Sequence, residues 1–127
     1  MSKLLSGQRI LVVEDEMMVL MNIECVLADL GCEEVTAAAT VGRALACIDA
    51  QMFDLAMLDV NLDGLPSYPI ADALAARGVP FVFSTGYGLH GIDQAYRDRP
   101  VLKKPFTDNE VAKSLAGLIP PEFENAA

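Results

Sequence analysis

Positively charged residues are scarce in this 127-residue chain, which has nine Lys and Arg against 18 Asp and Glu and a formal net charge of −9. Binding to a nucleic-acid backbone needs clustered Lys and Arg, and these residues are scattered here. The charge balance therefore argues against a nucleic-acid-binding protein. It suits a protein that binds cations or a basic partner.

Long hydrophobic runs and paired cysteines are also missing. No apolar segment approaches the roughly 20 residues of a membrane-spanning helix, and the opening residues, MSKLLSGQRI, lack the apolar stretch of a signal peptide. Cys25, Cys32 and Cys47 form no CxxC pair and cannot all be bridged, which favours reduced thiols. We therefore expect a soluble, cytoplasmic protein with no membrane contact.

Short apolar runs alternate along the chain with longer amphipathic ones, which predicts alternating strands and helices. The predicted strands are residues 9–13, 34–38, 54–59, 79–84 and 100–103, and the predicted helices are about 16–30, 40–51, 71–78 and a last one after residue 107. This alternation predicts an α/β fold, with a five-stranded parallel sheet covered by helices on both faces.

Three further features of this fold follow from the sequence. The segment 107–110, TDNE, predicts a capping box at the start of the last helix. The third predicted helix, 71–78, is short, and any helix within 86–99 should be short or irregular because GYGLHG brings three glycines into that segment. The length suits a single domain over 1–127, with its core at about 8–118 and a tail at 119–127.

Polar residues follow the predicted strands at their carboxyl ends. In a parallel sheet these ends share one edge, where ligand sites form. The residues concerned are Glu14 and Asp15 after the first strand, Asp59 and Asn61 at the third, Thr85 at the fourth and Lys104 at the fifth. We expect them to meet in one site.

The run Glu14, Asp15 and Glu16 allows two interpretations. Clustered carboxylates are hard oxygen ligands that suit Mg²⁺, and a bound cation would offset their repulsion. Alternatively, these acids only favour the positive end of the dipole of the following helix. The matching polar residues at other strand ends favour the metal site.

Four separated motifs, VVEDE, LDVNLDG, FSTGYG and KKPF, together resemble the receiver domain of bacterial two-component response regulators, over about residues 8–118. The resemblance implies a flavodoxin-like, doubly wound sheet with strand order 2-1-3-4-5. FSTGYG resembles the FATGY motif of a subgroup that often has no output domain, which implies a stand-alone receiver.

This resemblance also implies a role for each site residue. Asp59 would be the phosphoacceptor. Asp15 would bind Mg²⁺ directly, Glu14 would act through a water molecule, and Asn61 would contribute its backbone carbonyl. Asp59 would complete the metal ligands.

The remaining implied roles concern the phosphoryl group. Thr85 would donate a hydrogen bond to it, and the Lys104 ammonium would neutralise its charge. The Lys104–Pro105 peptide bond would be cis, which proline permits.

The phosphodonor would be a phosphohistidine on a sensor histidine kinase or a histidine phosphotransfer protein, because the single histidine here, His90, lies in a glycine-flanked loop. The protein would then bind a downstream target or drain phosphate from the kinase, with no enzyme activity beyond its own phosphotransfer and dephosphorylation. One departure concerns Val101, which stands where many receivers have an aromatic residue. The structural change that signals phosphorylation is therefore expected in residues 86–99 instead.

Two alternatives stay open. A pseudo-receiver would use the same fold as a fixed interaction module, although the complete set of Asp15, Asp59, Thr85 and Lys104 argues against it. A phosphohydrolase of the haloacid dehalogenase type also places its nucleophilic Asp after a strand. Such enzymes carry a second Asp as general acid two residues later, where this chain has Asn61.

Overall fold

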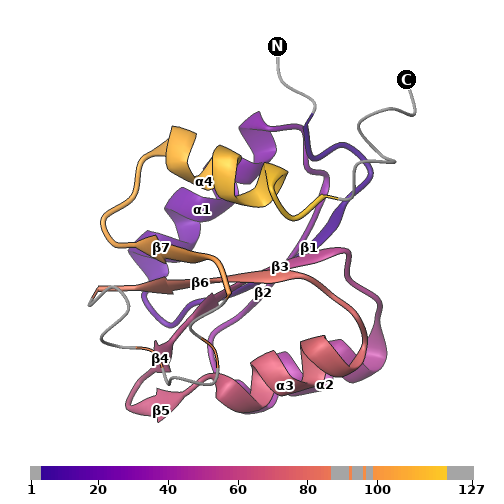
Figure 1. Ribbon diagram of the computed structural model, residues 1–127, viewed down its shortest axis with the longest axis vertical. Helices are drawn as coiled ribbons and strands as arrows, with labels where there is room; N and C mark the ends of the chain where they lie inside the picture. The colour runs from indigo at the N-terminus through magenta and orange to yellow at the C-terminus, as the bar shows by residue number, and fades with distance from the viewer. Residues whose placement is uncertain (1–3, 87–91, 93–95, 97–98, 120–127) are drawn as a thin grey trace.

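The computed structural model describes residues 4–86, 92, 96 and 99–119. A five-stranded parallel sheet lies at its centre (Figure 1). The strands are β1 (Arg9–Val13), β2 (Glu34–Ala38), β3 (Leu55–Asp59), β6 (Phe81–Thr85) and β7 (Val101–Lys103). Their order is β2-β1-β3-β6-β7. This confirms the predicted order 2-1-3-4-5, because β6 and β7 are the fourth and fifth strands of this sheet.

Helices cover the sheet on both faces, with α1 (Met17–Asp29) and α4 (Asp108–Ala116) on one side and α2 (Val41–Ala50) and α3 (Tyr68–Ala76) on the other (Figure 1). Successive strand residues point to opposite faces, so β1 contributes Ile10 and Val12 to the core under α1 and α4. Its Leu11 and Val13 enter the core under α2 and α3. Burial on both faces explains why the three central strands, β1, β3 and β6, are largely apolar.

The predicted start of the last helix and the predicted end of the first agree with the structure. At α4 the capping box is present: Glu110 N donates to Thr107 Oγ1 at 3.1 Å, and Thr107 N donates to Glu110 Oε1 at 2.8 Å. After α1 the chain turns at Gly31, whose φ of 91° is a left-handed conformation that glycine adopts without strain.

Two details near the site differ from the prediction. Helix α3 begins at Tyr68 and not at residue 71, because Pro69 occupies its first turn, where no backbone N–H is needed. A two-stranded antiparallel sheet, formed by β4 (Asn61–Leu62) and β5 (Leu65–Pro66), was not predicted, because strands of two residues carry no periodic pattern. As expected, α3 is short, with nine residues.

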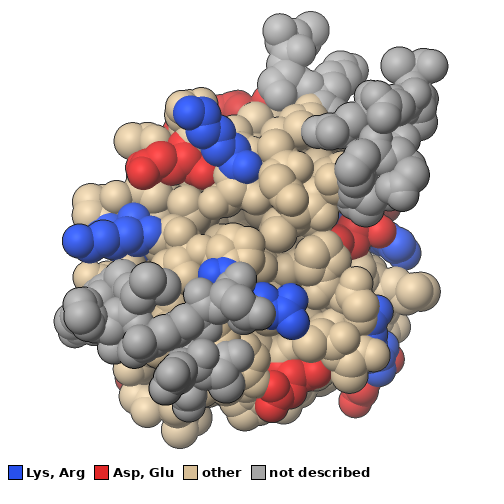
Figure 2. Space-filling view, viewed as in Figure 1, with Lys and Arg blue, Asp and Glu red and all other residues tan. Residues whose placement is uncertain are grey.

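The helix expected within 86–99 and the tail expected at 119–127 fall largely outside the described residues, as does His90. Within the part that the structure describes, no helix is long and apolar enough to cross a membrane. On the face drawn in Figure 2, the visible Lys and Arg side chains are spread out and interrupted by acidic and uncharged residues.

Candidate functional site

The predicted site residues meet at the carboxyl edge of the sheet. Asp59 is the last residue of β3 and Thr85 the last of β6, while Glu14 follows β1 and Lys104 follows β7. Strand register places Asp59 of β3 beside Ser84 of β6, and Thr85 of β6 beside Lys103 of β7. Parallel pairing therefore gathers side chains that are far apart in the sequence.

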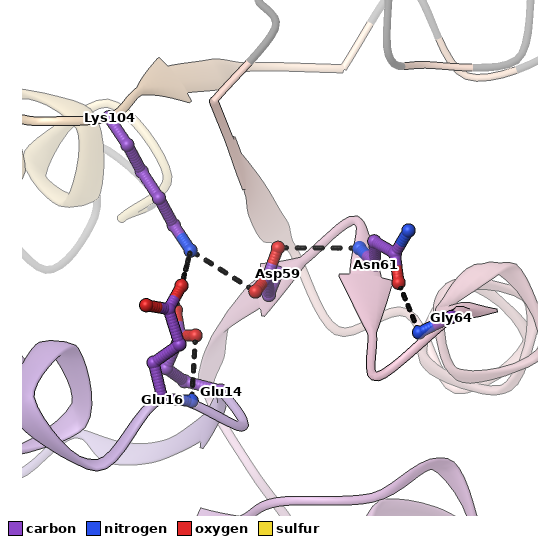
Figure 3. A network of polar contacts seen from close by, with 6 residues as sticks. All are labelled: Glu14, Glu16, Asp59, Asn61, Gly64 and Lys104. Carbon is purple, nitrogen blue, oxygen red and sulfur yellow. Dashed lines mark hydrogen bonds and ion pairs between the residues drawn. The ribbon is translucent and has the colours of Figure 1, made fainter.

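Lys104 is the centre of a polar network (Figure 3). Its Nζ donates to Asp59 Oδ2 at 3.1 Å and forms an ion pair with Glu14 Oε1 at 3.0 Å. Glu16 Oε1 lies further away, at 3.8 Å from the same nitrogen. The backbone helps to hold Lys104 in place, since its N–H donates to the Thr85 carbonyl at 2.8 Å. The peptide bond from Lys104 to Pro105 is cis, as the resemblance implied.

Burial makes this network electrostatically costly. Only 1% of the Glu14 side chain and 9% of the Asp59 side chain are exposed. Desolvation raises the pKa of Glu14 to about 7; the contact with Lys104 opposes this rise, and the negative charge of Asp59 adds to it. Burial by itself would lower the pKa of Lys104, but its contacts with Glu14 and Asp59 outweigh burial and raise that pKa. Lys104 therefore remains a cation at neutral pH.

Three carboxylates converge at this point. One oxygen each from Glu14, Asp15 and Asp59 lies within 4.8 Å of the other two, and Asp15 is exposed to solvent. A single Lys104 ammonium does not balance three carboxylates, so the cluster has surplus negative charge. These hard oxygen donors fit a divalent cation such as Mg²⁺, with room for water on the exposed side.

Asn61 lies next to the cluster but turns its side chain away from it. Its backbone N–H donates to Asp59 Oδ1 at 3.3 Å, whereas its side-chain Oδ1 accepts from Gly64 N at 2.7 Å (Figure 3). The side-chain amide is thus committed to the loop, and it is not placed as a general acid over Asp59. This argues against the phosphohydrolase alternative.

Thr85 is buried and lines, together with Asp59, a cavity of about 360 Å³. Tyr68 lines the same cavity, and sequence reasoning missed it. Its ring stacks on Tyr96 with centroids 4.8 Å apart, and both rings contact Phe83 edge-on. Tyr96 also donates a hydrogen bond to Asp72 of α3. The sequence offered one signal for this residue, the position of Tyr68 a few residues after the LDVNLDG motif.

A larger cavity, of about 500 Å³, lies at the opposite edge of the sheet. It is mainly apolar, with Ile48, Phe53 and Leu74 in its wall. The charged residues beside it form ion pairs, Arg9 with Asp54 at 3.0 Å and Arg77 with Asp49 at 3.1 Å. The two charged residues in the wall of this cavity, Asp54 and Arg77, are therefore both held in ion pairs.

Comparisons with known proteins agree with this geometry. The model of the response regulator receiver domain matches residues 10–116. The solution structure of SdrG from Sphingomonas melonis Fr1 has 49% sequence identity and a TM-score of 0.79, covering 87% of this chain and 95% of that one. The BeF3-activated conformation of SdrG from Pseudomonas melonis Fr1 has 46% identity and a TM-score of 0.77, covering 90% and 98%.

The receiver domain of the sensor histidine kinase PA1611 from Pseudomonas aeruginosa PAO1, with a magnesium ion in its active-site cleft, has 29% identity and a TM-score of 0.74, covering 89% of this chain and 98% of that one. Comparison with curated protein sequences gives no significant match. The family model spans most of the chain. This chain therefore belongs to the response regulator receiver domain family.

Proposed function

We propose that this receiver accepts a phosphoryl group on Asp59 from a phosphohistidine of a sensor histidine kinase or a histidine phosphotransfer protein. The phosphorylated form then signals by binding a partner protein or removes phosphate from the kinase. One observation carries the proposal: the Lys104 ammonium lies 3.1 Å from Asp59 Oδ2, where three carboxylates converge. Receiver domains are phosphoacceptor signalling modules and not typical enzymes.

The chemical step follows from the charges at this edge. A carboxylate oxygen of Asp59 forms a bond to phosphorus while the phosphorus–nitrogen bond of the donor histidine breaks, and the electron pair of that bond returns to the imidazole nitrogen. Negative charge spreads over the phosphoryl oxygens during transfer. Lys104, whose Nζ lies 3.1 Å from Asp59 Oδ2, would neutralise this charge. Thr85, which lines a cavity together with Asp59, would donate a hydrogen bond to the phosphoryl group.

We also propose a Mg²⁺ site in the acidic cluster. Asp15 and Asp59 would bind the ion directly, Glu14 through a water molecule, and Asn61 through its backbone carbonyl. When bound, the ion would supply positive charge to the phosphoryl oxygens. The support is the cluster itself, with oxygens within 4.8 Å of one another and a charge surplus that Lys104 does not cancel.

The test is incubation of the purified chain with Mg²⁺ and a small phosphodonor such as phosphoramidate, followed by intact mass. We expect one added phosphoryl group on the wild type and on Asp49→Asn, which changes an exposed aspartate far from the site, and none on Asp59→Asn. A wild type that gains no mass would support the pseudo-receiver. Donor consumption over many turnovers, without an adduct, would support a phosphohydrolase.

A further inference from the structure

A tight hairpin follows the phosphoacceptor position directly. Its strands β4 and β5 are joined by Asp63 and Gly64, with φ of 53° and 87°. Two consecutive left-handed residues make the two-residue turn that matches the natural twist of a hairpin, and Asp-Gly is a preferred sequence for it. The loop after Asp59 therefore has a defined shape.

The register of this hairpin decides where the backbone of Asn61 points. Asn61 pairs with Pro66, and Ser67 N donates to the Val60 carbonyl at 2.9 Å. This bond makes Val60 and Ser67 a hydrogen-bonded pair. Hydrogen-bonded and non-hydrogen-bonded pairs alternate along an antiparallel ladder, so the next pair, Asn61 with Pro66, is a non-hydrogen-bonded pair. Pro66 has no N–H to offer, which agrees with this register.

In a non-hydrogen-bonded pair, the N–H and C=O of a residue both face away from the partner strand. The N–H of Asn61 shows the direction, because it donates to Asp59 Oδ1 at 3.3 Å. Its carbonyl therefore faces the same side as Asp59, toward the acidic cluster. The ladder makes no use of this oxygen, which leaves it available to a cation.

The side chain of Asn61 forms a hydrogen bond with the backbone of the hairpin turn. Its Oδ1 accepts from Gly64 N at 2.7 Å, and Figure 3 shows it reaching toward Gly64 and away from the Asp59 carboxylate. The side chain of Asn61 thus stabilises the hairpin turn, and the hairpin sets the direction of the Asn61 backbone carbonyl.

We propose that the Asn61 side chain, through its bond to Gly64, is a positioning group that holds the Asn61 carbonyl toward the cation. The inference rests on the proposed function, because it assumes that the acidic cluster binds Mg²⁺. Without this bond the loop samples other conformations, and the carbonyl must be ordered again at each binding event. Loss of such a supporting contact weakens metal binding by roughly tenfold.

The experiment is calorimetric titration of the full folded chain with MgCl₂. We expect Asn61→Ala to bind Mg²⁺ roughly tenfold more weakly, although it keeps the backbone carbonyl. Gly64→Ala should also weaken binding, because its left-handed φ strains any residue with a side chain even where there is open space. Leu65→Ala is the matched control: its side chain is 60% exposed in the same hairpin and takes no part in the bond, so Mg²⁺ affinity should not change.

Amide exchange at Gly64, measured by NMR without Mg²⁺, gives a second readout. Exchange should be faster in Asn61→Ala than in the wild type and close to wild type in Asn61→Asp, whose carboxylate can accept the same bond. Faster exchange in Asn61→Ala with unchanged Mg²⁺ affinity would overturn the inference and leave the proposed function intact. A wild type that binds no Mg²⁺ would overturn the metal site itself.

Discussion

Replacing Glu14 by Gln should stabilise the metal-free protein at pH 8, although it removes a partner of Lys104. The carboxylate is almost fully buried beside Asp59, and this environment raises its pKa from 4.5 to about 7. A rise of this size corresponds to roughly 3 kcal/mol of unfavourable free energy for holding the ionised group in the fold. Gln has the shape of the protonated acid and avoids that cost, while Lys104 keeps its bond to Asp59.

The pH dependence follows from the sign of the shift. Because the pKa of Glu14 is raised in the folded state, the folded protein holds a proton that the unfolded chain has lost between pH 4.5 and about 7. The free energy of unfolding of the wild type therefore falls across this window relative to the variant. The two proteins should be equally stable below pH 4.5 and differ by roughly 3 kcal/mol above about pH 7.

Urea denaturation with EDTA at pH 4, 6 and 8 measures this difference. Glu33→Gln, an exposed substitution away from the site, is the control and should change stability little at any pH. If Glu14→Gln were less stable than the wild type at pH 8, the attraction of Lys104 would exceed the cost of burial, and the argument would be refuted. Added Mg²⁺ should narrow the gap, because a cation bound to the native state stabilises the ionised wild type.

Three further outcomes are expected. Mg²⁺ should raise the melting temperature of the wild type and have little effect on Asp15→Ala; equal responses would exclude Asp15 as a ligand. Thr107→Ala should lower the free energy of unfolding by about 1 kcal/mol through loss of the cap, and Thr107→Ser should restore it; an equal loss in both would point to a packing role for the methyl group. Phe83→Ala should cost about 3–5 kcal/mol because the ring is fully buried, whereas Met52→Ala, 71% exposed, should cost almost nothing; similar urea midpoints would contradict the packing argument.

Local patterns in the sequence were sufficient to predict the five-stranded sheet and the cap of the last helix. Apolar runs such as RILVV become strands because both of their faces are buried, and the capping box at Thr107 and Glu110 depends only on residues three positions apart. Parallel topology then places the ends of β1, β3, β6 and β7 at one edge. The sequence therefore predicted which side chains meet there, Glu14, Asp59 and Lys104 among them.

Interactions between distant residues were decided by the tertiary structure alone. Burial of Glu14 beside Lys104, and hence its raised pKa, depends on strand packing across 90 positions of sequence, from 14 to 104. The stack of Tyr68 on Tyr96 likewise joins α3 to the segment between β6 and β7. The sequence contained the Asp-Gly turn of the hairpin, but the direction of the Asn61 carbonyl follows from pairing with Pro66. Residue types determine which contacts are chemically possible, whereas register and burial determine which of them form and at what electrostatic cost.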